Sequence, residues 1–95
     1  MSSPKQKEAM AVQVAARAAD DILKSREALL LDHNLHIEIM TELLQSDMDL
    51  ISEADKSNSN VSNYVIRLEE LLAQKVELSQ ELLRKTRNLK EKLIR

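Results

Sequence analysis

Apolar residues recur at seven-residue intervals over most of the first half of the chain. Two adjacent series are largely apolar: Ala16, Leu23, Leu30, Ile37, Leu44 and Ile51, and, one residue earlier, Ile22, Leu29, His36, Leu43 and Leu50. A third series is mixed and contains Ala19, Arg26, His33, Met40, Asp47 and Ala54. Two adjacent apolar series make a stripe wider than the seam of a two-stranded coiled coil. The pattern therefore predicts a long helix that contacts more than one neighbour.

This first helix is expected to span residues 4–55, after a disordered start at residues 1–3. Ser3 can cap the helix, and Pro4 is tolerated at the first helical position. Asp and Asn lower helix propensity, so residues 32–34 are the place where an irregularity is expected if there is one. Because the apolar series stay in phase through residues 32–34, one long helix is favoured over two shorter ones.

Five polar residues at positions 56–60 follow the helical pattern and predict a turn. Asn60 or Ser59 can cap a second helix, which is expected to span residues 61–95. Its apolar positions recur at helical spacing: Val61, Tyr64, Val65, Leu68, Leu71, Leu72, Val76, Leu82, Leu83, Leu89 and Leu93. Two helices joined by one turn predict an all-α fold, a long helical hairpin that forms an antiparallel coiled coil.

The hairpin is expected to self-associate into a helical bundle, because two helices alone leave part of the wide apolar stripe in water. Residues 4–20 would also extend past the end of the shorter second helix. We expect the interhelix core to contain Ile37, Met40, Leu44, Ile51, Leu68, Leu72 and Leu82. The full set predicted for the core or the interface comprises Ile22, Leu29, Leu30, Ile37, Met40, Leu43, Leu44, Leu50, Ile51, Tyr64, Leu68, Leu72, Leu82 and Leu89.

The composition narrows the functional classes. The 95 residues include no Gly, no Cys, one Pro and one aromatic side chain. Without glycine there is no phosphate-binding loop, and no nucleophile stands beside a base, so the chain is not expected to be an enzyme by itself or to bind a cofactor. His33 and His36 are three residues apart on a helix, but no third histidine or cysteine accompanies them, and no metal site is expected. The absence of cysteine favours a reducing, cytoplasmic compartment.

Charge is distributed unevenly along the chain, although the formal net charge is only −2. Residues 20–55 carry two basic and ten acidic side chains, whereas residues 56–95 carry nine basic and five acidic ones. In an antiparallel hairpin the basic end of the second helix would lie near Asp20, Asp21 and Asp32. The basic residues Arg84, Lys85, Arg87, Lys90 and Lys92 are a candidate contact for an acidic partner such as a tubulin tail. Nucleic acid is not expected, because aromatic side chains for stacking are lacking, and no segment is apolar enough for a membrane.

A set of residues with fixed, ungapped spacing covers about half of the chain. It comprises Glu27-Ala28-Leu29-Leu30, His33, Ile37-Glu38, Met48, Leu50-Ile51, Glu53-Ala54-Asp55, Tyr64, Arg67-Leu68, Leu72 and Gln74-Lys75. With these residues the chain resembles the extreme C-terminal tail of the internal-motor kinesins that depolymerise microtubules, the thirteenth kinesin family. It departs from the pattern at Ser57-Asn58, where plant members tend to have proline and glycine, and at Asn34, where a basic residue is common.

The resemblance implies a part of a longer kinesin ATPase whose motor is not in this chain. It implies a non-catalytic tail that dimerises and that regulates or targets the motor on cytoplasmic microtubules. Its partners would be a second copy, with the kinesin's own motor domain, a microtubule-associated protein or tubulin as further candidates. The alternative is a helical adaptor or scaffold subunit that docks a different protein in a tethering or kinetochore-like complex.

Overall fold

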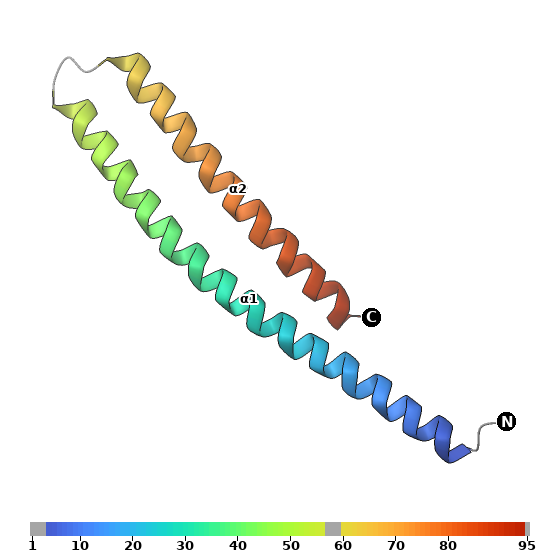
Figure 1. Ribbon diagram of the computed structural model, residues 1–95. Helices are drawn as coiled ribbons and strands as arrows, with labels where there is room; N and C mark the ends of the chain where they lie inside the picture. Colours follow the sequence, from blue (N-terminus) through green and yellow to red (C-terminus); the bar gives the residue numbers. More distant parts are fainter. Residues whose placement is uncertain (1–3, 57–59, 95) are drawn as a thin grey trace.

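The computed structural model describes residues 4–56 and 60–94. In this part of the chain there are two helices, α1 at Pro4–Asp55 and α2 at Val61–Leu93. They lie side by side and antiparallel in a rod of 83 × 18 × 16 Å (Figure 1). The all-α helical hairpin expected from the sequence is therefore confirmed.

The helix α1 is continuous through residues 32–34, where an irregularity was conceivable. The helix α2 begins after Asn60, whose extended backbone (φ −61°, ψ 111°) lets its side chain accept a hydrogen bond from the Ser62 amide. It ends at Leu93 rather than at residue 95, because Ile94 leaves the helical region with φ −102° and ψ 6°. The expected disordered start at residues 1–3 and most of the expected turn lie outside the described residues.

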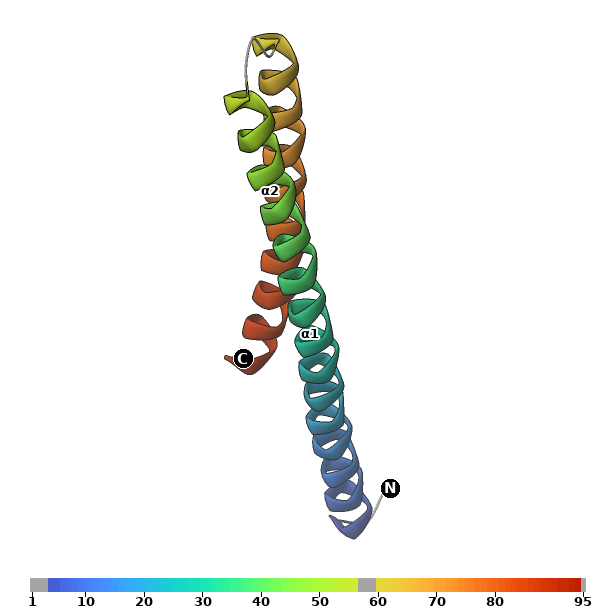
Figure 2. The ribbon, with the colours of Figure 1, turned by 90° about the vertical axis from the view of Figure 1, so that its left-hand side faces the viewer.

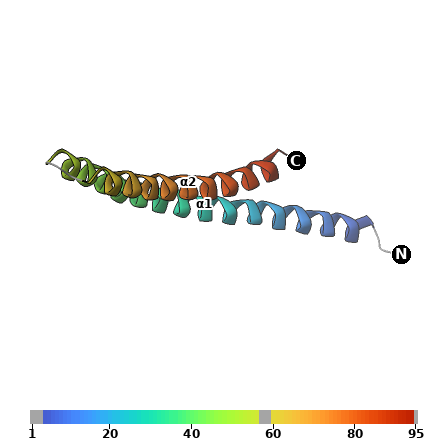
Figure 3. The same ribbon diagram turned by 90° about the horizontal axis from the view of Figure 1, so that it is seen from above.

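The N-terminal part of α1 extends well past the end of α2, as expected from the unequal helix lengths (Figure 2). Seen from above, the two helices overlap near the turn and diverge toward the C-terminal end of α2, and the first turns of α1 stand alone (Figure 3). All side chains described between residues 5 and 21 are exposed. We refer to residues 4–20 as the overhang.

Candidate functional site

The two helices meet along a narrow seam. Its positions are spaced alternately by three and four residues, the spacing that keeps one face of each helix toward the other. They are Ile22, Ser25, Leu29, Asp32, His36, Ile39, Leu43, Ser46 and Leu50 on α1, and Tyr64, Leu68, Leu71, Lys75, Leu78, Leu82, Lys85 and Leu89 on α2. Within the described residues only Leu50, at 2% exposure, is fully buried. The hairpin by itself therefore has a thin core.

Ion pairs across the seam fix the register of the two helices. Lys75 binds Asp47, and their side chains are only 29% and 17% exposed. Lys85 Nζ donates to Asp32 Oδ2 at 2.9 Å, and Arg67 Nη1 donates to Glu53 Oε2 at 3.1 Å. Because these pairs join residues far apart in the sequence, a shift of one helix along the other would break them all.

The basic end of α2 does lie near acidic residues of α1. Lys92 Nζ approaches Asp21 Oδ2 and Ser25 Oγ, each at 3.4 Å. Asp20, which was expected to take part, instead pairs with Lys24 on its own helix at 3.0 Å.

A second apolar stripe remains exposed on each helix. On α1 it contains Leu23, Leu30, Ile37, Leu44 and Ile51, and on α2 it contains Val65, Leu72, Val76 and Leu83, each between 44% and 56% exposed. Each of these residues directly follows a seam position, so both stripes are turned by about 100° from the seam in the same rotational sense. Because the helices are antiparallel, equal turns bring the two stripes to the same side of the hairpin. We call these nine residues the apolar face.

Except for Met40, the residues predicted for the core or the interface divide between the seam and the apolar face. Ile22, Leu29, Met40, Leu43, Leu50, Tyr64, Leu68, Leu82 and Leu89 are half-buried or buried. Leu30, Ile37, Leu44, Ile51 and Leu72 are exposed. The series through Ile37, Leu44 and Ile51, which was predicted for the interhelix core, therefore does not face α2. The series one residue earlier, through Leu43 and Leu50, faces α2 instead.

Several seam residues were missing from the predicted set, notably Ile39, Leu71, Lys75 and Leu78. On α1 the partners of the Ile22 series are Ser25, Asp32, Ile39 and Ser46, and three of these four are polar. A search for apolar side chains therefore passes over this series. The spacing of three and four residues, read together with the opposite charges of Lys75 and Asp47, is the signal that could have found it.

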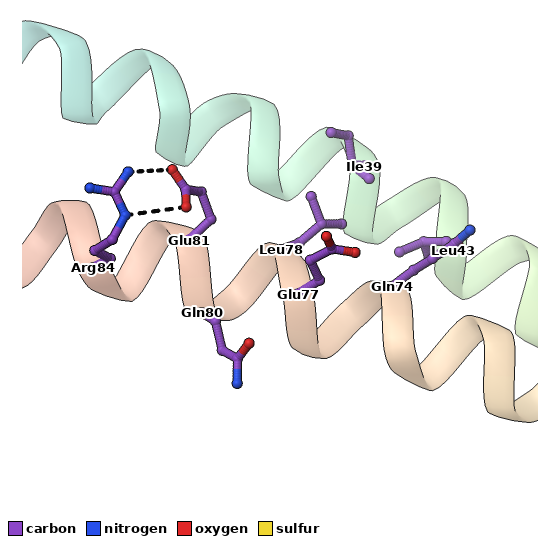
Figure 4. Close-up of a pocket in the computed structure, with 8 residues that line it drawn as sticks. All are labelled: Ile39, Leu43, Gln74, Glu77, Leu78, Gln80, Glu81 and Arg84. Atoms are coloured by element: carbon purple, nitrogen blue, oxygen red, sulfur yellow. Dashed lines mark hydrogen bonds and ion pairs between the residues drawn. The ribbon is translucent and has the colours of Figure 1, made fainter.

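An open groove of about 770 Å³ lies on the side of the hairpin opposite the apolar face. Figure 4 shows Leu78 of α2 directed toward Ile39 of α1, with polar side chains of α2 along the rim. Glu81 accepts hydrogen bonds from the Arg84 guanidinium at 2.5 and 3.3 Å. This hydrogen bonding lowers the pKa of Glu81 and raises the pKa of Arg84. Glu81 and Arg84 on the rim therefore pair with each other, and the residues that line the groove bring no nucleophile and base together.

Three of the five basic residues proposed to contact an acidic partner already form ion pairs within the chain. Arg84 binds Glu81, Lys85 binds Asp32 and Lys92 binds Asp21. Arg87 and Lys90 are exposed. The electrostatic attraction of this surface is therefore weaker than the count of basic residues indicates.

The two histidines lie in different surroundings. His33 is exposed, while His36 lies in the seam with its Nδ1 buried and without a hydrogen-bond partner among the described residues. Within residues 4–56 and 60–94 no group of three or more His, Asp or Glu side chains could hold a metal ion.

Neither helix in this part of the chain is long and apolar enough to cross a membrane. The same part is all-helical and has no catalytic fold.

Comparisons with known proteins identify a relative of this chain. No protein-family model matches the chain. No solved structure matches it. The chain is similar to the kinesin-like protein KIN-13A of Oryza sativa subsp. japonica, with 38% identity over an alignment of 79 residues, and the match covers 79% of this chain. The match covers 10% of that relative, so the chain spans about a tenth of its length. The similarity supports a relationship between this chain and kinesin-like proteins.

Proposed function

We propose that the chain is a non-catalytic dimerisation and regulatory tail of a microtubule-depolymerising kinesin motor. The similarity to a kinesin-like protein over 79 residues supports the kinesin context, and the small share of that relative leaves room for a motor outside this segment. The fixed set of residues from Glu27 to Lys75 supports a tail of the thirteenth kinesin family in particular. In this proposal the chain acts at the cytoskeleton and carries no catalytic residue.

The contrast between the thin seam and the exposed apolar face carries the proposal. Leu50 is the one buried apolar residue among the residues that the structure describes, which is a small core for a hairpin of this length. Monomeric proteins rarely leave a contiguous stripe of large apolar side chains in water. A second hairpin packed on the apolar face would complete a four-helix bundle and bury the stripes of both copies. Two motors joined by such a bundle could be held, targeted or inhibited together.

The overhang favours a second candidate function, that of a helical adaptor for a different protein. Its side chains include Ala9, Val12, Ala15 and Ala16, which are exposed and small enough to permit close approach of another helix. Sedimentation of the chain separates the two functions. A folded dimer supports the first, whereas a poorly folded monomer that gains helix only with a partner supports the second.

The test of the first function uses one substitution on the apolar face. Leu44→Asp places a carboxylate in the surface that the second copy would cover, and burying an unpaired charge is strongly unfavourable. Because Leu44 is 56% exposed in the hairpin, the hairpin itself should tolerate the change. Light scattering should show a shift from the mass of a dimer to that of a monomer. The dissociation constant of the dimer should rise at least about tenfold.

Leu31→Asp is the matched control. Leu31 is 71% exposed and lies away from the apolar face, so the same chemical change should leave the mass of the dimer unaltered. If the original chain is monomeric, or if Leu44→Asp and Leu31→Asp behave alike, the proposed dimerisation through the apolar face is wrong.

A further inference from the structure

In the mixed series that borders the apolar face on α1, residues equally far from the middle match in size in two pairs and are opposite in charge in the third. From its N-terminal end it reads Ala19, Arg26, His33, Met40, Asp47 and Ala54. From the other end it again begins with alanine, and the charged residue that follows has the opposite sign. The apolar face on α1 is centred half a residue away, because Leu23 and Ile51 lie equally far from Ile37 while the mixed series is centred between residues 36 and 37.

We infer that a second copy of the chain packs on the apolar face with its turn at the opposite end. This inference rests on the proposed dimerisation and specifies its geometry. The two-fold axis passes close to Ile37, so that α1 lies antiparallel to α1 of the second copy. Leu23 then faces Ile51 of the second copy, and Leu30 faces its Leu44. At the same time Arg26 faces its Asp47, and the same pairs form again on the other side of the axis.

The charged residues distinguish this arrangement from the one with both turns at the same end. In that alternative α1 faces α2 of the second copy. Arg26 is then level with Lys90 of the second copy, because Asp32 and Asp21 of α1 pair with Lys85 and Lys92 of α2. Asp47 would face an apolar part of α2. The same-end arrangement therefore opposes like charges and adds no partner for Asp47, whereas the opposite-end arrangement joins Arg26 to Asp47.

Asp47 is well placed to take a second basic partner. Its side chain is only 17% exposed and already binds Lys75. A carboxylate can accept hydrogen bonds at both oxygens, and Arg is the side chain best suited to such sites. Arg26 of the second copy would extend the pair to three residues across the interface. Polar positions within an apolar seam commonly fix the register and the orientation of paired helices.

The overall charge of the two ends supports the same orientation. Residues 42–78, which form the turn end, carry eight acidic and three basic side chains, a net charge of −5. Residues 20–41 and 79–95, which form the open end of the paired part of the hairpin, carry seven acidic and eight basic side chains, a net charge of +1. With turns at opposite ends, each acidic end lies beside an end that carries little net charge. With turns at the same end, the two acidic ends repel each other.

Cross-linking tests the orientation directly, because the natural chain has no cysteine. One tagged copy carrying Leu23→Cys is refolded with an untagged copy carrying Ile51→Cys and is then oxidised. In the proposed dimer these two sulfur atoms lie close together, whereas two copies of either variant alone have their sulfur atoms about 42 Å apart along the axis. Ile37→Cys should cross-link to itself. We expect disulfide-linked dimers from the mixture and from Ile37→Cys only.

The outcomes separate this inference from the function on which it rests. If the chain has the mass of a dimer but the mixture does not cross-link, the orientation is wrong and dimerisation stands. The same conclusion follows if Leu23→Cys readily cross-links to itself. If the chain is a monomer at all concentrations, both the orientation and the proposed function fail.

A charge substitution gives a second, independent readout. Arg26→Asp should weaken the dimer about tenfold at low salt, because it places a carboxylate opposite Asp47, and the effect should shrink at high salt. Lys7→Asp makes a similar charge reversal at the far end of the overhang, away from the acidic turn end of the second copy, and should alter the dissociation constant less than about twofold. Equal effects of the two substitutions would contradict a pair between Arg26 and Asp47.

Discussion

The pair of Lys75 and Asp47 shows how single residues set the arrangement of the hairpin. Both side chains are mostly withdrawn from water, while the pair of Lys24 and Asp20 on α1 is 73% and 62% exposed. An exposed pair gains little because water screens both charges, whereas a half-buried carboxylate that loses its partner keeps its desolvation penalty. Removal of Lys75 should therefore destabilise the hairpin more than removal of Lys24.

Lys75→Ala should lower the free energy of unfolding by about 1–3 kcal/mol, because it leaves Asp47 unpaired in the seam. Lys24→Ala, the control, should lower it by less than about 1 kcal/mol. Urea unfolding followed by circular dichroism, at one fixed protein concentration, measures both changes. Equal losses would mean that the seam pair contributes no more than a surface pair.

At the residue scale the sequence predicted which side chains avoid water but not which surface covers them. Leu43 and Leu44 are adjacent, equally apolar and each part of a long seven-residue series. Only Leu43 faces α2, whereas Leu44 is exposed. The choice depends on the rotation of α1 about its axis, which the seam pairs of α2 help to fix. Apolar periodicity within one helix does not contain that information, and this is why the predicted interhelix core was displaced.

At the scale of elements, the start of α2 depends on a single cap. The Asn60 side chain accepts a hydrogen bond from the Ser62 amide at 3.0 Å. Asn60→Ala should therefore destabilise the folded chain by about 1 kcal/mol, and Asn60→Asp, which can also cap, should restore most of the loss. Thermal melting followed by circular dichroism at a fixed protein concentration tests both variants. A melting temperature unchanged by Asn60→Ala would show that the cap is dispensable.

The helices themselves were predictable because their signals agree with one another. Apolar series of constant phase run along α1, and five polar residues separate it from the second pattern. The low helix propensity of Asp32 and Asn34 did not interrupt α1. A penalty of a few tenths of a kcal/mol per residue is small beside the packing of Leu29, Ile39 and their neighbours against α2. The end of α2 was harder to place, because helix termini lack such periodic support.

At the scale of the whole molecule, the unequal helix lengths separate two surfaces that could serve different partners. The apolar face spans the paired part of the hairpin, from Leu23 to Ile51 on α1. The overhang lies beyond the end of α2 (Figure 1). In a dimer with its axis near Ile37, the turn of the second copy lies level with residues near 20. Most of the overhang would then remain outside the four-helix bundle.

Removal of residues 1–15 tests whether these two surfaces are independent. We expect the shortened chain to keep the mass of a dimer, with a dissociation constant changed by less than about threefold, because residues 5–15 are exposed and lie beyond the end of α2. Circular dichroism should show a helical signal lower by the contribution of residues 4–15 alone. Sedimentation over a dilution series measures the dissociation constant. If the deletion abolishes the dimer, the overhang belongs to the interface and the axis cannot lie near Ile37. If the dimer persists while a partner helix is no longer captured, the overhang acts as a docking segment separate from dimerisation.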